Sequence, residues 1–428
     1  MNSAVGQTST PQTIGGFSIE AIREKFPALK HAAPFIFLDN AAGAQIPQAV
    51  FDAVNHHLLD HNVQRGGRYP KSQQVDETIA RGRKSVADFV NARTPNEIAF
   101  GMNATSFIRI ISLAIGQTLG ERNEIVVTDM DHEANIATWL ALERDGAKFR
   151  WWKMRDDGNL YADDLCEVMS ARTRLVAGTV TSNALGSVVD VAAAAKAAHA
   201  AGAELFLDCV HFAPHGVIDV QAWDCDYLVC SGYKIFAPHM GFLWGREELL
   251  RELPTFREDF IPNEPPLKIE AGTFVYENVA GMDAAIGYLA SLGATRDGNA
   301  SAASSRRGNI TRAMKEIQQY EEMLSLEMLR VLKESGAIVY GISMKERIAE
   351  RVPTLCFNLP GVAPAEVTET MSRANIGIRD GHLYSPRLMK RLGLSLETGA
   401  VRASLVHYNT IEEIHRFGSV LLDLSKHA

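Results

Sequence analysis

Two residues of the sequence have side chains that together suggest a specific chemistry. Lys234, in "CSGYKIFAP", follows an apolar run, and Asp208 ends the earlier apolar run "LFLD". A lysine amine can form a Schiff base with an aldehyde, and an aspartate can keep a pyridine nitrogen protonated so that the ring withdraws electrons. The pair therefore predicts a site for pyridoxal 5′-phosphate (PLP). Taken alone, such a lysine is usually a solvated loop charge and such an aspartate usually a turn or cap residue.

A phosphate group would need hydroxyl or backbone donors at the beginning of a helix. The segment "GMNATSFIRIISLAIG", residues 101–116, offers Thr105 and Ser106 at the head of a helix with apolar periodicity. Both residues fit the role of a helix N-cap equally well. The segment is thus a candidate phosphate site, and it is equally consistent with an ordinary helix start.

The elements that would position these residues are short apolar runs rich in Val, Leu and Phe. We predict strands at "EIVVTDMDH" (124–132), "RLVAGTVTSN" (174–183), "AELFLDCVH" (203–211), "DYLVC" (226–230) and "GFLWG" (241–245). Because they are continuously apolar and linked by helices such as "DVAAAAKAAHAAG", they indicate an α/β fold with a mainly parallel sheet covered on both faces. In such sheets ligands bind at the carboxyl ends of the strands. Polar residues follow the strands there: Asp131, His132, Asn183, Asp208, His211, Ser231 and Lys234.

From about Phe26 to the C-terminus the chain resembles the class V aminotransferase family of fold-type I PLP enzymes, and within it the cysteine desulfurase-like branch. The motifs that carry the resemblance are "DHEAN", "TSNALG", "LDCVH", "CSGYK", "EAGT" and "VRASLVHYNT", in the order of the family. The resemblance implies a large PLP-binding domain and a smaller α+β C-terminal domain. We place the boundary between residues 295 and 296, at the start of the polar stretch "RDGNASAASSRRGN", and residues 17–35 could pack on the small domain.

The resemblance implies roles for residues around the cofactor. Lys234 would be the Schiff-base lysine, Asp208 the partner of the pyridine nitrogen, and His132 the ring that stacks on the pyridine and can carry protons. Asn183 and His211 would lie near the phenolic oxygen. The phosphate would be held by Thr105, Ser231 and Tyr233, while Ala104 stands where the family has a hydroxyl. Structural roles as caps, turns or core residues stay open for His132, His211, Asn183, Thr105 and Thr273.

On the substrate side the resemblance implies that Arg402 binds a carboxylate, a role that the planar fork of its guanidinium suits. A surface ion pair is the alternative for Arg402. Ala41, in "LDNAAG", is assigned to substrate binding, as are His382 and Tyr384 in "RDGHLYS". Thr273 of "EAGT" would reach the phosphate of the neighbouring protomer, which implies a homodimer.

The chain departs from the family at the segment that carries the persulfide cysteine. Tyr384 occupies the place of that cysteine, and a phenol with a pKa near 10 cannot hold a persulfide. We therefore expect a PLP-dependent C–S or C–Se β-lyase acting on a cysteine-type amino acid, with Tyr384 as an acid, a recognition group or a wall of the pocket. The alternatives are a class V aminotransferase, an amino-acid epimerase and, outside enzymes, a non-catalytic PLP-binding regulator.

Composition narrows the remaining possibilities. The 428 residues carry a net charge of −8 without a long basic run, so we expect neither nucleic acid nor a membrane as partner. The five cysteines are odd in number and lack a CxxC pair, which favours reduced thiols in the cytoplasm. Residues 1–16 are polar without an apolar core, so we expect a disordered N-terminus and no signal peptide. No metal site is predicted.

Overall fold

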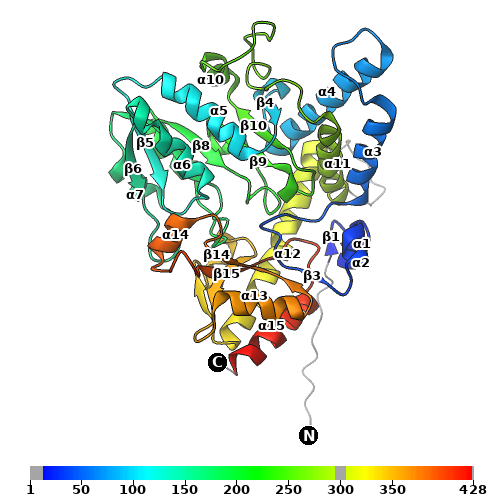
Figure 1. Ribbon diagram of the computed structural model, residues 1–428, viewed down its shortest axis with the longest axis vertical. Coiled ribbons are helices and arrows are strands. Elements are labelled where there is room, and N and C mark those ends of the chain that lie inside the picture. The colour runs from blue at the N-terminus through cyan, green and yellow to red at the C-terminus, as the bar shows by residue number, and fades with distance from the viewer. Residues whose placement is uncertain (1–12, 295–304, 427–428) are drawn as a thin grey trace.

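The computed structural model describes residues 13–294 and 305–426, and its largest element is a seven-stranded sheet (Figure 1). In spatial order the strands are β4 (Ile98–Gly101), β10 (Gly241–Gly245), β9 (Tyr227–Ser231), β8 (Glu204–Asp208), β7 (Thr173–Thr179), β5 (Glu124–Thr128) and β6 (Lys148–Trp152). Strands β5 to β9 pair in parallel, whereas β10 runs antiparallel to β4 and β9. The predicted mainly parallel sheet is confirmed.

Helices cover both faces of this sheet because successive strand residues are apolar. On one face Ile125, Val127 and Phe206 pack with residues of α5 and α6, and on the other Val126, Leu205 and Leu207 pack with residues of α8 and α11. The helices of this part are α3 (Gln48–His61), α4 (Pro70–Val90), α5 (Ala104–Gln117), α6 (Ala134–Leu140), α7 (Ala162–Val168), α8 (Val191–Ala200), α9 (Val220–Trp223), α10 (Glu247–Glu252) and α11 (Tyr276–Leu292).

A second, four-stranded antiparallel sheet lies below the large one in Figure 1. Its strands are, in order, β11 (Ile338–Tyr340), β12 (Thr354–Asn358), β15 (Ala400–Ser404) and β14 (Arg379–Gly381). The helices near it are α12 (Arg306–Glu334), α13 (Pro364–Arg373), α14 (Pro386–Arg391) and α15 (Ile411–Ser425). The long helix α12 packs against both α11 and α15, so it joins the two sheets into one molecule.

The beginning of the described chain contacts its end. Helices α1 (Ile19–Arg23) and α2 (Pro27–His31) are followed by β3 (Ile36–Phe37), which pairs with β13 (Ile376–Gly377). Arg23 forms an ion pair with Glu413 at 2.9 Å, and the ring of Phe26 packs edge-on against Tyr408. Segment 19–37 therefore contacts α15, Tyr408 and β13, all of them far from it in sequence.

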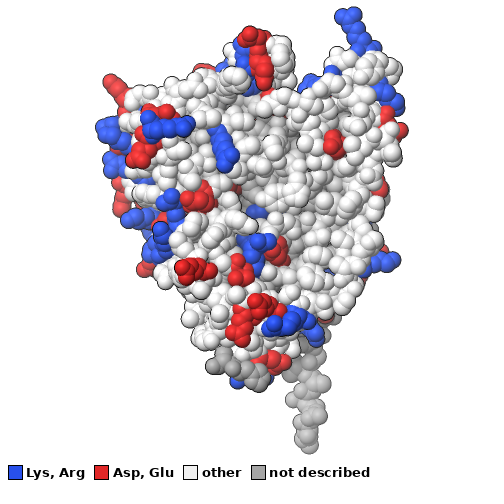
Figure 2. All heavy atoms as spheres, viewed as in Figure 1, with Lys and Arg blue, Asp and Glu red and all other residues white. Residues whose placement is uncertain are grey.

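Two expectations from the sequence, the disordered N-terminus and the domain boundary, fall largely on residues outside the described ranges. Residues 1–12 of the predicted disordered segment lie outside the described residues, while β1 (Thr13–Ile14) pairs with β2 (Phe17–Ser18). The polar stretch 296–309 lies largely within 295–304, also outside the described residues, and its last residues, 306–309, begin α12; the domain boundary there stays a prediction. Among the described residues no helix has the length and apolar character needed to cross a membrane. On the face shown in Figure 2, acidic and basic side chains are interspersed.

Candidate active site

One pocket lies at the carboxyl ends of the parallel strands, where the sequence pattern predicts it. It is a small cavity of about 50 Å³ between the strand ends and the beginning of α5. Nine of the predicted site residues line it: Ala104, Thr105, His132, Asn183, Asp208, His211, Ser231, Tyr233 and Lys234. The residues come from five separate segments, which the parallel topology brings to one edge of the sheet.

Lys234 ends a short 3₁₀ turn, Gly232–Lys234, directly after β9. Its side chain is buried, with the residue 6% exposed. Burial, reinforced by the nearby positive charge of Arg402, lowers its pKa to about 8, although Asp208 opposes the shift. The neutral amine, the form that acts as a nucleophile or proton acceptor, is therefore much more populated near physiological pH than in an exposed lysine, although it remains the minor form.

Asp208 is the last residue of β8 and lines the same pocket. Its Oδ1 accepts a hydrogen bond from the backbone N–H of Val210 at 3.0 Å. Burial raises the pKa of the carboxyl, while the Val210 amide and the Lys234 ammonium lower it. Parallel pairing of β8 with β9 aligns Asp208 with Val229, so the carboxylate and the lysine occupy neighbouring strand ends.

His132 lies in the turn between β5 and α6, and its Nδ1 accepts a hydrogen bond from the N–H of Ala134 at 3.1 Å. Burial lowers its pKa to about 4, with Lys234 and Arg402 adding to the shift, so the imidazole is neutral. The ring stacks on Tyr384, with centroids 5.7 Å and planes 28° apart. A neutral, fixed ring over a pocket of this kind is suited to stack on a planar ligand.

His211 lines the pocket and has one buried ring nitrogen that forms no hydrogen bond within the described residues. Its Nε2 is 2.9 Å from Thr354 Oγ1 on β12, and within the described part of the chain its buried Nδ1 has no hydrogen-bond partner. Burial holds its pKa well below the usual value. The ring packs edge-on against His215, which is hydrogen bonded to Glu321 of α12 at 2.7 Å. A ligand oxygen would satisfy the free nitrogen.

The opposite end of the pocket is the N-terminus of α5. Asn103 caps the helix in a reciprocal capping box with Ser106, so Ser106 serves the helix start. Ser231 Oγ accepts a hydrogen bond from the N–H of Ala104 at 3.1 Å, which ties β9 to this helix. Since the Ala104 and Ser106 N–H groups are engaged by Ser231 and Asn103, an anion at this helix start would be met by the Thr105 N–H and by the Thr105 and Tyr233 side chains.

The loop after β14 is fastened over the pocket by Asn183. The Asn183 Nδ2 donates to the backbone oxygen of Leu383 at 2.8 Å, and Ser385 Oγ donates to Asn183 Oδ1 at 3.0 Å. Leu383 and Tyr384 have positive φ angles of 53° and 59°, a conformation that non-glycine residues seldom adopt. The Asn183 amide therefore holds this loop in the described structure, in addition to lining the pocket.

Tyr384 and His382 project from this loop. The Tyr384 side chain is half exposed, and its backbone oxygen accepts the N–H of Glu133 at 2.8 Å, beside the stacked His132 ring. His382 Nδ1 accepts the Tyr384 N–H at 3.1 Å. Neither residue lines the pocket itself; Tyr384 is joined to it through the stacked ring of His132.

Arg402, on β15, adjoins the pocket from the smaller sheet. Its guanidinium is buried, and Nη1 donates to the backbone oxygen of Asn183 at 2.8 Å. Nη2 pairs with Asp39 Oδ1 at 3.1 Å, and the buried Nε has no partner within the described residues. Ala41 lies in the same loop as Asp39, where its N–H donates to Ser404 Oγ at 2.8 Å. Arg402 thus presents a buried free donor, as a carboxylate site requires.

Thr273 is the one predicted site residue that lies apart from the others. It is exposed, and its hydroxyl accepts a hydrogen bond from Gln64 Nε2 at 2.6 Å. It does not line the pocket of its own chain. Its expected role in the pocket of a second protomer stays a prediction.

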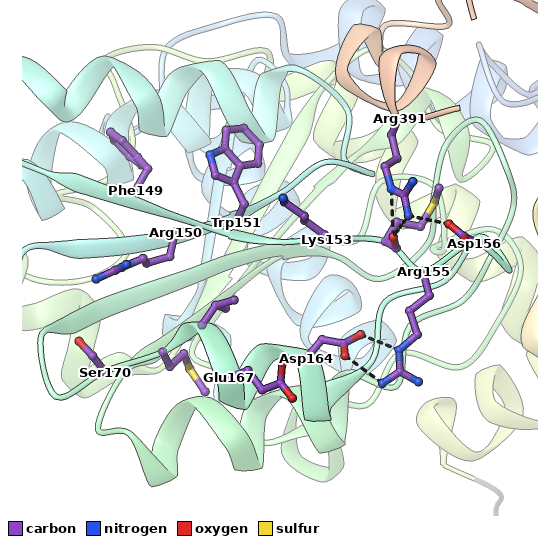
Figure 3. A pocket seen from close by; sticks show the side chains of 13 residues that line it. Phe149, Arg150, Trp151, Lys153, Arg155, Asp156, Asp164, Glu167, Ser170 and Arg391 are labelled. Atoms are coloured by element: carbon purple, nitrogen blue, oxygen red, sulfur yellow. Dashed lines mark hydrogen bonds and ion pairs between the residues drawn. The ribbon is translucent and has the colours of Figure 1, made fainter. Parts of the chain in front are cut away.

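A larger open hollow lies elsewhere, along the edge strand β6 and helix α7 (Figure 3). Its charged side chains largely pair with one another, as Arg155 does with Asp164 and Arg391 with Asp156. It contains none of the predicted site residues. The chemistry-bearing groups converge on the smaller pocket, which is therefore the candidate active site. Within the described ranges, no three His, Cys, Asp or Glu side chains are grouped to hold a metal ion.

The sequence reasoning missed the lining residues Thr179 and Thr181, and also two residues that contact the site, Asp39 and Thr354. Asp39 follows the apolar segment "FIFL", so the rule that polar residues after strands form the site would have found it. Thr354, the partner of His211, begins β12 of the smaller sheet and gave no such signal, because its contact joins segments distant in sequence.

The lowered pKa of Lys234 leads to a pH-dependent reactivity. In cofactor-free protein we expect reductive methylation of Lys234 to rise with pH and reach half its maximal rate near pH 8, because the neutral amine is the reactive form. In protein unfolded by denaturant the midpoint should return to about 10.4. Peptide mass spectrometry over a pH series measures both values. A folded-state midpoint above 10 contradicts the described environment of the amine.

The described cysteines are free thiols, four of them buried and Cys166 exposed on α7. Cys209 and Cys230 lie in the strand region next to Asp208, and burial raises the pKa of both thiols above its usual range. Burial raises the pKa of Cys356 to about 12. None of the five lines the pocket.

The family model described as Aminotransferase class-V matches residues 36–310 and 309–417 of the chain. A relative named "Probable cysteine desulfurase" from Synechocystis sp. (strain ATCC 27184 / PCC 6803 / Kazusa) is 32% identical, with 92% of this chain and 93% of the relative aligned. The "Aminotransferase-like protein FGM3" of Gibberella zeae is 33% identical, over 93% of this chain and 96% of its own.

Solved structures give the same result. The apo structure of cysteine desulfurase from Thermococcus onnurineus NA1 superposes with a TM-score of 0.84 at 27% identity, covering 96% of this chain and 98% of the other. The cysteine desulfurase CsdA from Escherichia coli superposes with a TM-score of 0.79 at 25% identity, covering 96% and 99%. The similarity extends over both sheets, because nearly the whole length of each chain is aligned.

Proposed function

Because this chain belongs to the aminotransferase class-V family, whose members are generally PLP-dependent, we propose that it is a PLP enzyme acting on an amino acid. The reaction that we propose is β-elimination from a cysteine-type substrate, a C–S or C–Se β-lyase reaction without a persulfide cysteine. The observation that carries the proposal is the buried Lys234, with its pKa lowered to about 8, beside Asp208 in one pocket.

The residues of the pocket fit the proposed cofactor. Asp208 would hold the proton of the pyridine nitrogen, His132 would cover one face of the ring, and the unsatisfied His211 Nδ1 would meet an oxygen. The N-terminal turn of α5, with Thr105, Ser231 and Tyr233 around it, would hold the phosphate. When bound, PLP supplies an aldehyde for the substrate amine and an electron-withdrawing ring beside the α-carbon.

Side chains of this protein would carry out the remaining steps of the proposed reaction. The free donor at Nε of Arg402 would bind the substrate carboxylate and so orient the α-carbon toward Lys234. Lys234 Nζ would then take the α-proton, which its lowered pKa permits near neutral pH. The hydroxyl of Tyr384, whose ring stacks against His132, would donate a proton to the leaving sulfur.

Elimination is favoured over sulfur transfer through the protein by the identity of residue 384. Desulfuration through a persulfide requires a nucleophilic thiol that reaches the substrate. The segment 379–385 contains Tyr384 and no cysteine. The buried thiols nearest in the fold, Cys209 and Cys230, have raised pKa values and do not line the pocket. A low-molecular-weight sulfur or selenium product is therefore the proposed outcome.

Product analysis tests the proposal. Cofactor-loaded protein is incubated with L-cysteine, L-cystine and L-selenocysteine, and pyruvate, ammonia, alanine and released sulfide are quantified. We expect pyruvate and ammonia in equal amounts with the released sulfur or selenium compound. Alanine together with protein-bound sulfur contradicts β-elimination and supports sulfur transfer. The Tyr384→Phe variant, which keeps the ring and removes the hydroxyl, reports whether the phenol acts as an acid.

Transamination is the second candidate, and the relative named aminotransferase-like protein FGM3 favours it. An aminotransferase would convert the cofactor to its pyridoxamine form and release a keto acid without ammonia. Spectra recorded after mixing with single amino acids separate this outcome from elimination. Epimerisation would be seen as loss of optical activity without either product.

We also propose a homodimer in which Thr273 of one protomer completes the phosphate site of its partner. The exposed position of Thr273, away from the pocket of its own chain, supports this arrangement. The proposed compartment is the cytoplasm, since free thiols suit a reducing environment. A monomer by light scattering would contradict the shared site.

A further inference from the structure

Two arginines of the smaller sheet, Arg379 and Arg402, share one carboxylate. Asp39 Oδ1 is 3.1 Å from Nη2 of Arg402, and Asp39 Oδ2 is 2.9 Å from Nη2 of Arg379. Arg379 also donates to Oδ2 through Nε, at 3.0 Å. One aspartate therefore bridges β14 and β15, the two strands that carry these guanidinium groups.

The bridge leaves the two arginines in different states. Nε and Nη2 of Arg379 both donate to Asp39 Oδ2, and Arg379 lies partly at the surface. Arg402 is 1% exposed and retains a buried Nε without a partner in the described part of the chain. A ligand carboxylate has therefore one desolvated donor to meet at Arg402, while Arg379 is already engaged.

The charges of Asp39, Arg379 and Arg402 favour the binding of a ligand with one carboxylate. Arg379, Arg402 and Asp39 together carry one net positive charge. The charges of Arg402, Asp39 and Asp208 all act on the neighbouring Lys234. A first carboxylate neutralises the excess charge of these three side chains, whereas a second one would face Asp39 with both arginines already paired.

We infer that Asp39 positions Arg402 and restricts the carboxylate site to ligands with one carboxylate. The inference rests on the proposed function, because it takes Arg402 as the group that holds the substrate. It adds to that function that Asp39, in the loop after β3, makes the enzyme select against acidic amino acids. Asp39 acts here as a positioning and selectivity residue, since it contacts the arginines and not the reacting atoms.

The test uses probes that cannot react. Propionate carries one carboxylate and succinate two, and neither has an amine. Their dissociation constants are measured by calorimetry on the cofactor-loaded protein, for the wild type and for the Asp39→Asn, Asp39→Glu and Asp380→Asn variants. Asp380 is the matched control, because it neighbours Arg379 in sequence but bonds to Thr368 Oγ1 at 2.8 Å.

We expect the wild type to bind propionate about tenfold or more tightly than succinate. Asn at position 39 should lower this preference by about tenfold, because Arg379 is then free to pair with a second carboxylate. Asp39→Glu should retain much of the preference, and Asp380→Asn should leave it unchanged. The ratio of the dissociation constants of propionate and succinate does not change when a variant loses affinity for both ligands equally. If Asp39→Asn folds poorly, Asp39→Glu still tests the inference.

Three results overturn the inference. The first is a wild type that binds no propionate or binds succinate equally well, and the second is an Asp39→Asn ratio within twofold of the wild type. The third is an equal change in Asp380→Asn, which would indicate a nonspecific charge effect. Failure of the proposed function is seen separately, as the lack of a cofactor absorption band or of turnover with any amino acid.

Discussion

Replacing Lys234 by alanine should abolish turnover while leaving the fold intact. We expect kcat to fall by about 10²–10⁴-fold or more, because the side chain is both the proposed attachment point of the cofactor and the acceptor of the α-proton. Steady-state assays with the preferred amino acid and the absorption spectrum of the purified protein measure the two consequences. The cofactor band characteristic of the wild type should be lost or shifted.

Two further variants separate chemistry from charge and from packing. Lys234→Arg keeps a positive charge but cannot serve as a neutral amine, so it should be as inactive as Lys234→Ala. Lys268→Ala removes another buried lysine, whose Nζ donates to the Arg251 backbone oxygen at 2.8 Å away from the pocket. It should retain wild-type activity per folded molecule. Turnover by Lys234→Ala within tenfold of the wild type would exclude the proposed role.

Asp208→Asn has the second largest expected effect. The carboxylate at the end of β8 would stabilise positive charge on the pyridine nitrogen, and an amide of the same shape cannot. We expect kcat to fall by about 10²–10³-fold with a much smaller change in the affinity for PLP. Steady-state kinetics and equilibrium titration of the cofactor-free protein with PLP measure these two quantities.

Asp226 provides the matched control for Asp208. It is also buried next to β9, where it accepts the N–H of Leu205 at 2.7 Å and pairs with Arg246. Asp226→Asn should lower thermal stability without changing kcat by more than a few fold. An Asp208→Asn variant with an unchanged kcat would show that the carboxylate does not act on the cofactor ring.

Much of the large sheet could be predicted because its buried strands are continuously apolar. The predicted runs correspond to β5, β7, β8, β9 and β10, and the residues that follow them form the pocket. The edge strands β4 and β6 were missed. Strand β6, "KFRWW", alternates charged and aromatic residues because only one of its sides is buried against the protein, and β4 has only four residues.

The pairing partners within the site were harder to predict. Asn183 was assigned to the cofactor, but in the structure its amide holds the backbone of Leu383 and the hydroxyl of Ser385. The sequence separation between these groups is too large for any local pattern to show the contact. The same is true of Asp39 and Arg402, whose ion pair joins the two ends of the chain.

Ser106 illustrates a different limit. A hydroxyl at the head of a helix can bind a phosphate or cap the helix, and the sequence pattern is the same in both cases. In the structure Ser106 forms the capping box with Asn103, whereas Thr105 lines the pocket. Only the direction of each side chain, which depends on its exact place in the first turn, separates the two roles.

The most direct test of the central claim is to locate the cofactor on the chain. Purified protein saturated with PLP is treated with borohydride, which makes the attachment to the lysine permanent, and its peptides are analysed by mass spectrometry. We predict a single pyridoxyl adduct on Lys234 and its loss in Lys234→Ala. An adduct on another lysine, or no adduct on correctly folded protein, would contradict the proposed site.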